Sequence, residues 1–180
     1  VETRNGLISG FGGMPAKDQV DTPLMFTGIQ IFEPRILDYI PRGVFSHSTT
    51  DVFPHAIAKG ERIAAHVTEG KWRELSTLQR YLDISVEMFR ETGQGASLGR
   101  NNQISPDATI VDSVLWDNVH VAKGARVNRA VLADNVRISA NEVIENAVVV
   151  PRMLIEGKTP PEKALRGVIK GENFVVPLSR

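Results

Sequence analysis

Aliphatic residues recur along the second half of the chain with a spacing that belongs to neither a helix nor a lone strand. From Ile104 to Ile155 they are separated by steps of 6, 5, 6, 6, 5, 6, 6, 5 and 6 residues, so the pattern closes every 17 residues. A helix places apolar residues at steps of three and four, and a strand at steps of two. The ten positions are Ile104, Ile110, Leu115, Val121, Val127, Leu132, Ile138, Ile144, Val149 and Ile155.

Direct comparison of segments gives the same period. "SVLWDNVHVAKGARVN" from Ser113 aligns with "AVLADNVRISANEVIE" from Ala130, and "AVVV" from Ala147 begins a third copy. Steps of six in groups of three predict a triangular coil, in which each side is a short strand and each turn stacks on the one before. The alternative is an antiparallel sandwich with valine-rich strands, but a sandwich has no reason to keep a 17-residue register.

The part before the repeat has the mixed periodicity of an α/β segment. Residues 24–32 and 62–68 predict strands, and residues 33–40 and 51–60 predict short helices. Asn5-Gly6, between "VETR" and "LISGF", predicts a hairpin turn. The chain starts without a methionine and inside this hairpin, so we expect it to be the remainder of something longer.

A longer helix is predicted from Ser76 to about Thr92. Ser76 and Gln79 have the spacing of a capping box, and Gly93 ends the helix. The polar, glycine-rich segment that follows predicts a linker. We therefore expect an α/β segment at residues 1–93, a linker at 94–103, a solenoid at 104–159 and a C-terminal tail at 160–180 that caps the last strand edges.

Composition narrows the function classes. Lys and Arg balance Asp and Glu at 21 each, so no nucleic-acid or anionic-membrane partner is expected. The chain has no cysteine, which excludes disulfides, thiolate metal sites and cysteine nucleophiles. No apolar run is long enough to span a bilayer and no signal peptide is visible, so the expected location is the cytoplasm.

Several segments together resemble a known family. They are "FTGIQIFEPRILDYIP", then "DVFPHAIAKGERIAAHVTEGKWRELSTLQRYLDIS", then the hexapeptide coils. The chain resembles the C-terminal half of a sugar-phosphate nucleotidyltransferase, and within that family the mannose-1-phosphate guanylyltransferases. "GKWRELSTLQRYL" is the most specific element. The resemblance implies the C-terminal part of a Rossmann-like nucleotidyltransferase domain, followed by a left-handed parallel β-helix of hexapeptide repeats.

The resemblance also implies the reaction and its partners. A sugar 1-phosphate oxygen attacks the α-phosphorus of a nucleoside triphosphate, and an NDP-sugar and pyrophosphate are formed. Two anions must approach each other, so the family uses Mg²⁺ and cationic side chains, and no protein nucleophile is needed. The product implied for this chain is GDP-mannose. The family's glycine-rich phosphate loop has no counterpart here, so we expect the isolated chain to be inactive.

Site residues follow from the resemblance position by position. The metal-binding carboxylate corresponds to Glu74, next to Trp72, which is a candidate substrate contact. The family's Asn-Ala-Gly strand, which contacts the sugar, corresponds to Phe26-Thr27-Gly28. Its Glu-Lys-Pro, which holds the sugar phosphate, corresponds to Gly13-Met14-Pro15, with Lys17 as a substitute cation. The substrate candidates are therefore Thr27, Gly28, Gly13, Lys17 and Trp72.

Departures from the family pattern at Met14, Phe26 and Glu74 keep a second hypothesis open. It is a non-catalytic regulatory homologue that binds a nucleotide sugar or a partner enzyme. A third is a hexapeptide-repeat acyltransferase with His120 as general base, which would leave the α/β segment unexplained. The stacked flat faces of a solenoid also predict a homo-oligomer.

Overall fold

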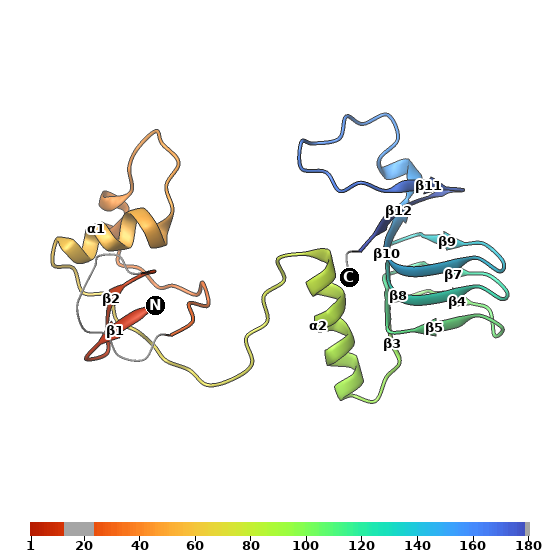
Figure 1. Cartoon of the computed structure of the whole chain (residues 1–180), viewed down its shortest axis with the longest axis horizontal. Coiled ribbons are helices and arrows are strands. Elements are labelled where there is room, and N and C mark those ends of the chain that lie inside the picture. Colours follow the sequence, from red (N-terminus) through yellow and green to blue (C-terminus); the bar gives the residue numbers. More distant parts are fainter. Residues whose placement is uncertain (13–23, 179–180) are drawn as a thin grey trace. The chain divides into compact units, whose positions relative to one another are not determined.

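The computed structural model describes residues 1–12 and 24–178, and the chain divides into two compact units (Figure 1). Val1–Trp72 is here called the hairpin unit, and Arg73–Arg180 the solenoid unit. The division falls before the long helix and not at residue 93, because that helix packs on the solenoid. Each unit is described by itself.

A two-stranded antiparallel hairpin opens the first unit. Strands β1 (Glu2–Arg4) and β2 (Leu7–Gly10) pair with Arg4 opposite Leu7. The two residues between them, Asn5 and Gly6, have φ angles of 53° and 74°. Asparagine and glycine are the residues that accept this left-handed conformation in a two-residue hairpin turn. The predicted hairpin turn is confirmed.

Three short helical segments follow. They are η1 (Pro34–Tyr39), a 3₁₀ helix, η2 (Ser48–Val52), a π turn, and α1 (Phe53–Ala58). Both predicted helices are therefore present, although the first is 3₁₀ and the second starts as a π turn. Val52 and Phe53 pack with Phe11 in the small core of this unit.

The two strands predicted at residues 24–32 and 62–68 are wrong as strands. Residues 62–68 make only an isolated antiparallel bridge, Leu7 with Ala64, supported by a 2.7 Å bond from Ile8 N to Ile63 O. A strand needs a continuous backbone partner, and the described part of this unit offers only the short hairpin. The parallel sheet of a Rossmann-like domain is accordingly not seen in the described residues.

The second unit contains a parallel β-solenoid. Its strands are β3 (Ala96–Leu98), β4 (Gln103–Ile104), β5 (Thr109–Val111), β6 (Ser113–Leu115), β7 (His120–Val121), β8 (Arg126–Leu132), β9 (Arg137–Ile138) and β10 (Val143–Pro151). Every pairing among them is parallel and joins residues 17 apart, as in Leu115 with Leu132. The predicted triangular coil is confirmed (Figure 1).

Nine of the ten aliphatic positions stack in three columns. The columns are Ile104–Val121–Ile138, Ile110–Val127–Ile144 and Leu115–Leu132–Val149. Together with small neighbours they form one buried core cluster. Ile155 is the exception, because β10 ends at Pro151 and the 3₁₀ turn η3 (Arg152–Leu154) leads the chain away before Ile155 is reached.

Each coil bends at residues with a left-handed backbone. Asn101, Asn118 and Asn135 lie 17 residues apart and have φ angles of 56°, 61° and 63°. A ladder of carboxylates runs beside them. Asp117 Oδ1 accepts from Arg100 N at 2.8 Å, and Asp134 Oδ1 accepts from Asp117 N at 2.8 Å. Asparagine tolerates the left-handed region and aspartate satisfies the turn amides, so the same two residue types recur at this corner.

Helix α2 (Leu78–Glu91) covers the outer face of one side of the solenoid. Its buried residues Leu82, Val86 and Phe89 pack on an outward valine row, Val114, Val131 and Val148. The helix begins one residue later than predicted. Thr77 is the N-cap, since its hydroxyl accepts from Arg80 N at 3.1 Å, and Ser76 does not have this role.

The C-terminal segment folds back on the last coil. Strand β12 (Asn173–Pro177) pairs antiparallel with β10, and β11 (Val168–Lys170) pairs antiparallel with β12. The solenoid therefore runs from β3 to β10, so it starts inside the segment expected to be a linker and ends before residue 159. Its periodicity is weaker at these ends, where turn and strand residues mix.

Candidate functional site

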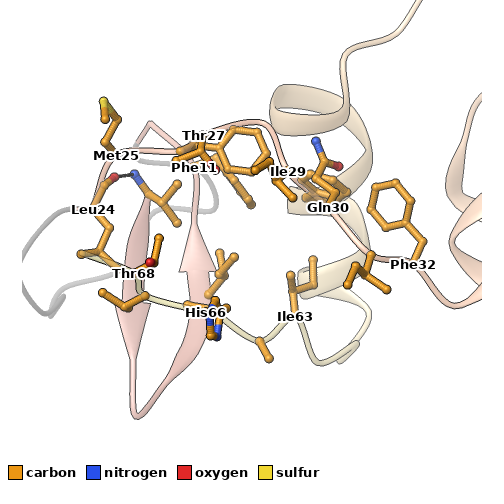
Figure 2. Close-up of a pocket in the computed structure, with 18 of the residues that line it drawn as sticks. Phe11, Leu24, Met25, Thr27, Ile29, Gln30, Phe32, Ile63, His66 and Thr68 are labelled. Atoms are coloured by element: carbon orange, nitrogen blue, oxygen red, sulfur yellow. Dashed lines mark hydrogen bonds between the residues drawn. The ribbon is translucent and has the colours of Figure 1, made fainter. Parts of the chain in front are cut away.

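The hairpin unit contains a large hollow between the hairpin and two extended segments. The cavity has a volume of about 800 Å³ and is lined from residues 24–36 and 61–72 together with the hairpin and α1 (Figure 2). The extended segments are held against the hairpin by backbone bonds, Leu24 N to Val1 O at 2.8 Å and Ala65 N to Gly6 O at 3.1 Å. Residues far apart in the sequence thus share one wall.

Aromatic rings form much of this wall. The Phe11 ring meets the Phe26 ring edge-on at 5.4 Å between centroids, and it lies 5.2 Å from the Phe53 ring. Ile29, Ile63 and other aliphatic side chains complete an apolar lining. Such a surface binds apolar faces of a ligand, and a sugar ring would need polar partners from the rim.

The polar rim of the hollow is centred on Glu61. This carboxylate accepts from the Tyr39 hydroxyl at 2.9 Å and pairs with the Arg35 guanidinium at 2.8 Å. The hydrogen bond to Glu61 raises the pKa of the Tyr39 hydroxyl above its usual value. Arg35 is therefore already paired, and an incoming phosphate would have to compete with Glu61 for it. Sequence reasoning missed this cluster, because its members are distant in the chain and carry no common motif.

The predicted substrate residues meet the hollow unevenly. Thr27 and Trp72 both line it. Gly28 does not, and an added Cβ there would touch nothing within 4 Å; its φ of 84° shows that a turn, not a close approach, requires glycine at this position. Gly13 and Lys17, like Met14, lie outside the described residues.

The metal candidate Glu74 belongs to the other unit. Its Oε2 accepts from Arg80 Nη1 at 2.8 Å, and both side chains are exposed. No group of three or more His, Asp or Glu side chains suited to a metal ion occurs within residues 1–12 and 24–178. A single carboxylate that is paired with arginine does not fit the oxygen-rich coordination of Mg²⁺, so we derive no step through a metal from these residues.

His120 lies on an outer face of the solenoid, in register between Gln103 and Arg137. Across the described part of the chain, no carboxylate contacts its imidazole. A general base is normally oriented by such a partner and faces a substrate cleft, and the described hollow lies in the other unit. The geometry gives no support to His120 as the base of an acyltransferase.

No helix in the described ranges has the length and apolar character needed to cross a bilayer. This agrees with the absence of a long apolar run in the sequence.

Comparison with known proteins adds independent information. Residues 90–160 match the family described as GlmU-like, C-terminal hexapeptide. The chain is 32% identical over 122 residues to a UTP–glucose-1-phosphate uridylyltransferase from Synechocystis, covering 67% of this chain and 31% of that protein. It is 27% identical over 118 residues to a mannose-1-phosphate guanylyltransferase from Mycobacterium tuberculosis, covering 63% of this chain and 32% of that protein.

The chain thus spans about a third of the length of these two relatives. The family match covers α2's last residues and the whole solenoid, which is the region where the 17-residue register was found. The chain is therefore a distant homologue of the sugar-phosphate nucleotidyltransferases and carries a hexapeptide-repeat solenoid similar to that of the GlmU-like family.

Proposed function

We propose that this chain is part of an enzyme that joins a sugar 1-phosphate to a nucleoside triphosphate, with GDP-mannose and pyrophosphate as products. The similarity to two proteins named for transfer of a nucleotidyl group to a sugar 1-phosphate carries the proposal. One of them is named for uridylyl transfer to glucose 1-phosphate and the other for guanylyl transfer to mannose 1-phosphate. The order of segments in the sequence favours the second.

In this proposal the hollow of the hairpin unit receives the sugar end of the substrate. Trp72 offers an indole face and Thr27 a hydroxyl to a sugar ring, and Phe26 supports the wall from behind through its contact with Phe11. The sugar phosphate would draw on cations that the described residues do not supply free, since Arg35 is paired with Glu61. Lys17 is proposed for that role.

The complete protein would use Mg²⁺ to offset the charge of the two phosphates as pyrophosphate leaves. Glu74, paired with Arg80, contributes no metal site of its own here, so we assign the metal to the substrates' phosphates and to residues beyond this chain. We take the protein to act in the cytoplasm and as a homo-oligomer.

The test is a matrix of substrates given to the full-length protein. Pyrophosphate release is measured with GTP or UTP, each combined with mannose 1-phosphate or glucose 1-phosphate. GTP with mannose 1-phosphate is expected to be fastest. A faster reaction with UTP and glucose 1-phosphate would overturn the assigned product and leave the reaction class standing. Release by the 180-residue chain alone would refute its expected inactivity.

Variants of the hollow sharpen the test. Thr27→Val removes one hydroxyl, and loss of one hydrogen bond to the sugar would raise KM about threefold to tenfold. Trp72→Ala removes the indole face and is expected to have the larger effect. Met153→Ala is the matched control, because Met153 is 76% exposed on the other unit. Equal kinetics for all three variants would mean that the sugar binds elsewhere.

A non-catalytic regulatory homologue remains the second candidate. Two observations favour it: the pairing of Glu74 with Arg80, and the apolar lining of the hollow. A full-length protein that binds GDP-mannose in a thermal-shift assay but releases no pyrophosphate in any combination would establish this function and reject the first.

A further inference from the structure

The two ends of the solenoid are finished in different ways. At the C-terminal end every side of the prism has a partner. Strand β12 pairs with β10, Asn173 Nδ2 donates to Arg137 O at 2.7 Å, and Lys170 Nζ donates to Val143 O at 3.4 Å. Asn173 is 3% exposed, so this cap is built into the core. The terminal strand edges that a solenoid leaves are thus satisfied at this end.

The first coil, formed by β3, β4 and β5, has no such cap in the described residues. Each of these strands is the last of its ladder, and each pairs only with the coil above it. The columns open here as well. Leu98 is 54% exposed, whereas Leu115, which lies directly above it, is 1% exposed. Ile104 and Ile110 are only partly buried, unlike Val121 and Val127 above them.

The backbone of the first coil also points outward. The amides of Gln103, Ser105 and Thr109 are bonded to Val119 O, Val121 O and Ala125 O of the second coil, each at 2.9 Å. Successive residues of a strand direct their backbone groups to alternate sides, so the N–H and C=O groups of Ile104 and Ile110 face the open end. Unpaired edges of this kind are templates for another strand.

The charges at this end identify the kind of partner. Residues 101–111 include one charged residue, Asp107, and it pairs with Lys123 at 3.6 Å. Arg100 at the adjacent corner pairs with Asp117 at 2.8 Å. The rim has no lysine to repel a second strand edge, and its formal charges are already balanced. A highly charged partner would gain nothing here, whereas an identical neutral rim would meet no repulsion.

We infer that the first-coil end is a self-association surface, on which the same end of a second copy of this chain docks about a twofold axis. With the axis in the plane of the end and perpendicular to β4, the β4 edges of the two copies oppose each other antiparallel. Strand β3 of each copy then opposes β5 of the other. The contact is isologous and closes as a dimer, because the opposite end of each solenoid is capped. It does not depend on the proposed enzymatic reaction.

The test measures the association of the 180-residue chain by sedimentation equilibrium over a wide range of concentrations. A reversible dimer is expected. The variant Gln103→Lys with Thr109→Lys places charges on two exposed positions of the open edge, in the way natural edge strands avoid pairing. Like charges opposed across the twofold axis are expected to raise the dimer Kd by about tenfold or more.

The control is His120→Lys with Val143→Lys, which lies on the same two outward rows but on later coils. It is expected to dimerise like the parent chain. Hydrogen exchange gives a second reading, in which the amides of Ile104 and Ile110 gain protection as concentration rises. A monomeric parent chain, or a dimer that the open-edge variant leaves unchanged while the control disrupts it, would overturn the inference.

Discussion

The solenoid and the hairpin unit treat their apolar residues in opposite ways. In the solenoid Leu132 is fully buried, and its column neighbours on both sides are 1% exposed or less. In the hairpin unit Ile31 is 99% exposed and Ile29 is 75% exposed. The difference shows that repetition lets each coil bury its side chains against the next one, whereas the hairpin unit depends on contacts that its described residues do not supply.

The largest effect should come from breaking a column. Leu132→Ala leaves a cavity in the middle of a stack and is expected to lower the free energy of unfolding of the solenoid by about 2–5 kcal/mol. Ile31→Ala in the hairpin unit should change stability by less than about 0.5 kcal/mol. Urea unfolding followed by Trp116 fluorescence, in a Trp72→Phe background, reports the solenoid. Similar costs for both changes would contradict the comparison.

The next effect concerns the close approach of successive coils. A Cβ at Gly99 would lie 2.6 Å from Asp117 Oδ1 and 2.7 Å from the Trp116 carbonyl, so Gly99→Ala forces the coils apart. The expected cost is about 1–3 kcal/mol. Gly95→Ala is the matched control, since a Cβ there meets nothing within 4 Å. Thermal unfolding of the two variants measures the difference, and equal melting temperatures would show that the coils are not in tight register here.

A smaller effect distinguishes the observed helix cap from the predicted one. Thr77→Ala removes the hydroxyl that accepts from Arg80 N and should destabilise α2 and its packing by about 1 kcal/mol. Ser76→Ala, one residue earlier, should cost much less. If Ser76→Ala were the more harmful change in urea unfolding, the capping box expected from the sequence would be correct after all.

The smallest effect is electrostatic and joins α2 to the solenoid. Burial opposes ionisation of the Asp83 carboxyl, but hydrogen bonds from Gln79 and Arg129 outweigh it, so the pKa of Asp83 lies below its usual value. A carboxyl with a lowered folded-state pKa stabilises the fold above its unfolded-state pKa. That stabilisation is lost as the pH falls through the folded-state value.

Because both side chains are partly exposed, the contribution is about a few tenths of a kcal/mol. The measurement is a double-mutant cycle with Asp83→Asn and Arg129→Gln, followed by urea unfolding at neutral and at acidic pH. Coupling between the two changes is expected at neutral pH and should fade in acid. Coupling that persisted unchanged in acid would exclude an ionic origin.

The solenoid was predictable because its information is local. Nine of the ten aliphatic positions lie in the predicted columns, since a fixed step along the chain returns each side chain to the same wall. The Asn5-Gly6 turn and the long helix were predictable for the same reason, because each depends on a few neighbouring residues. Ile155 was mistaken because spacing alone does not reveal where the chain leaves the stack.

The hairpin unit and its hollow were less accessible. Residues 24–32 have the alternation of a strand, yet a strand exists only when a partner supplies its hydrogen bonds, and that partner cannot be read from the segment itself. The contact of Glu61 with Arg35 and Tyr39 joins residues more than 20 positions apart with no repeat to align them. The outward row of Val114, Val131 and Val148 did repeat every 17 residues, but its purpose required knowing that α2 lies over it.

The carboxylate ladder at the asparagine corner also determines how many times the chain winds. Each rung needs an acceptor 17 residues after the amide that it caps, and the residue 17 positions after Asp134 is Pro151, whose ring offers none. The count of turns is therefore encoded at one imino acid. Duplicating a 17-residue segment ahead of it would make the prism longer by about 4.8 Å and leave both of its extremities as they are.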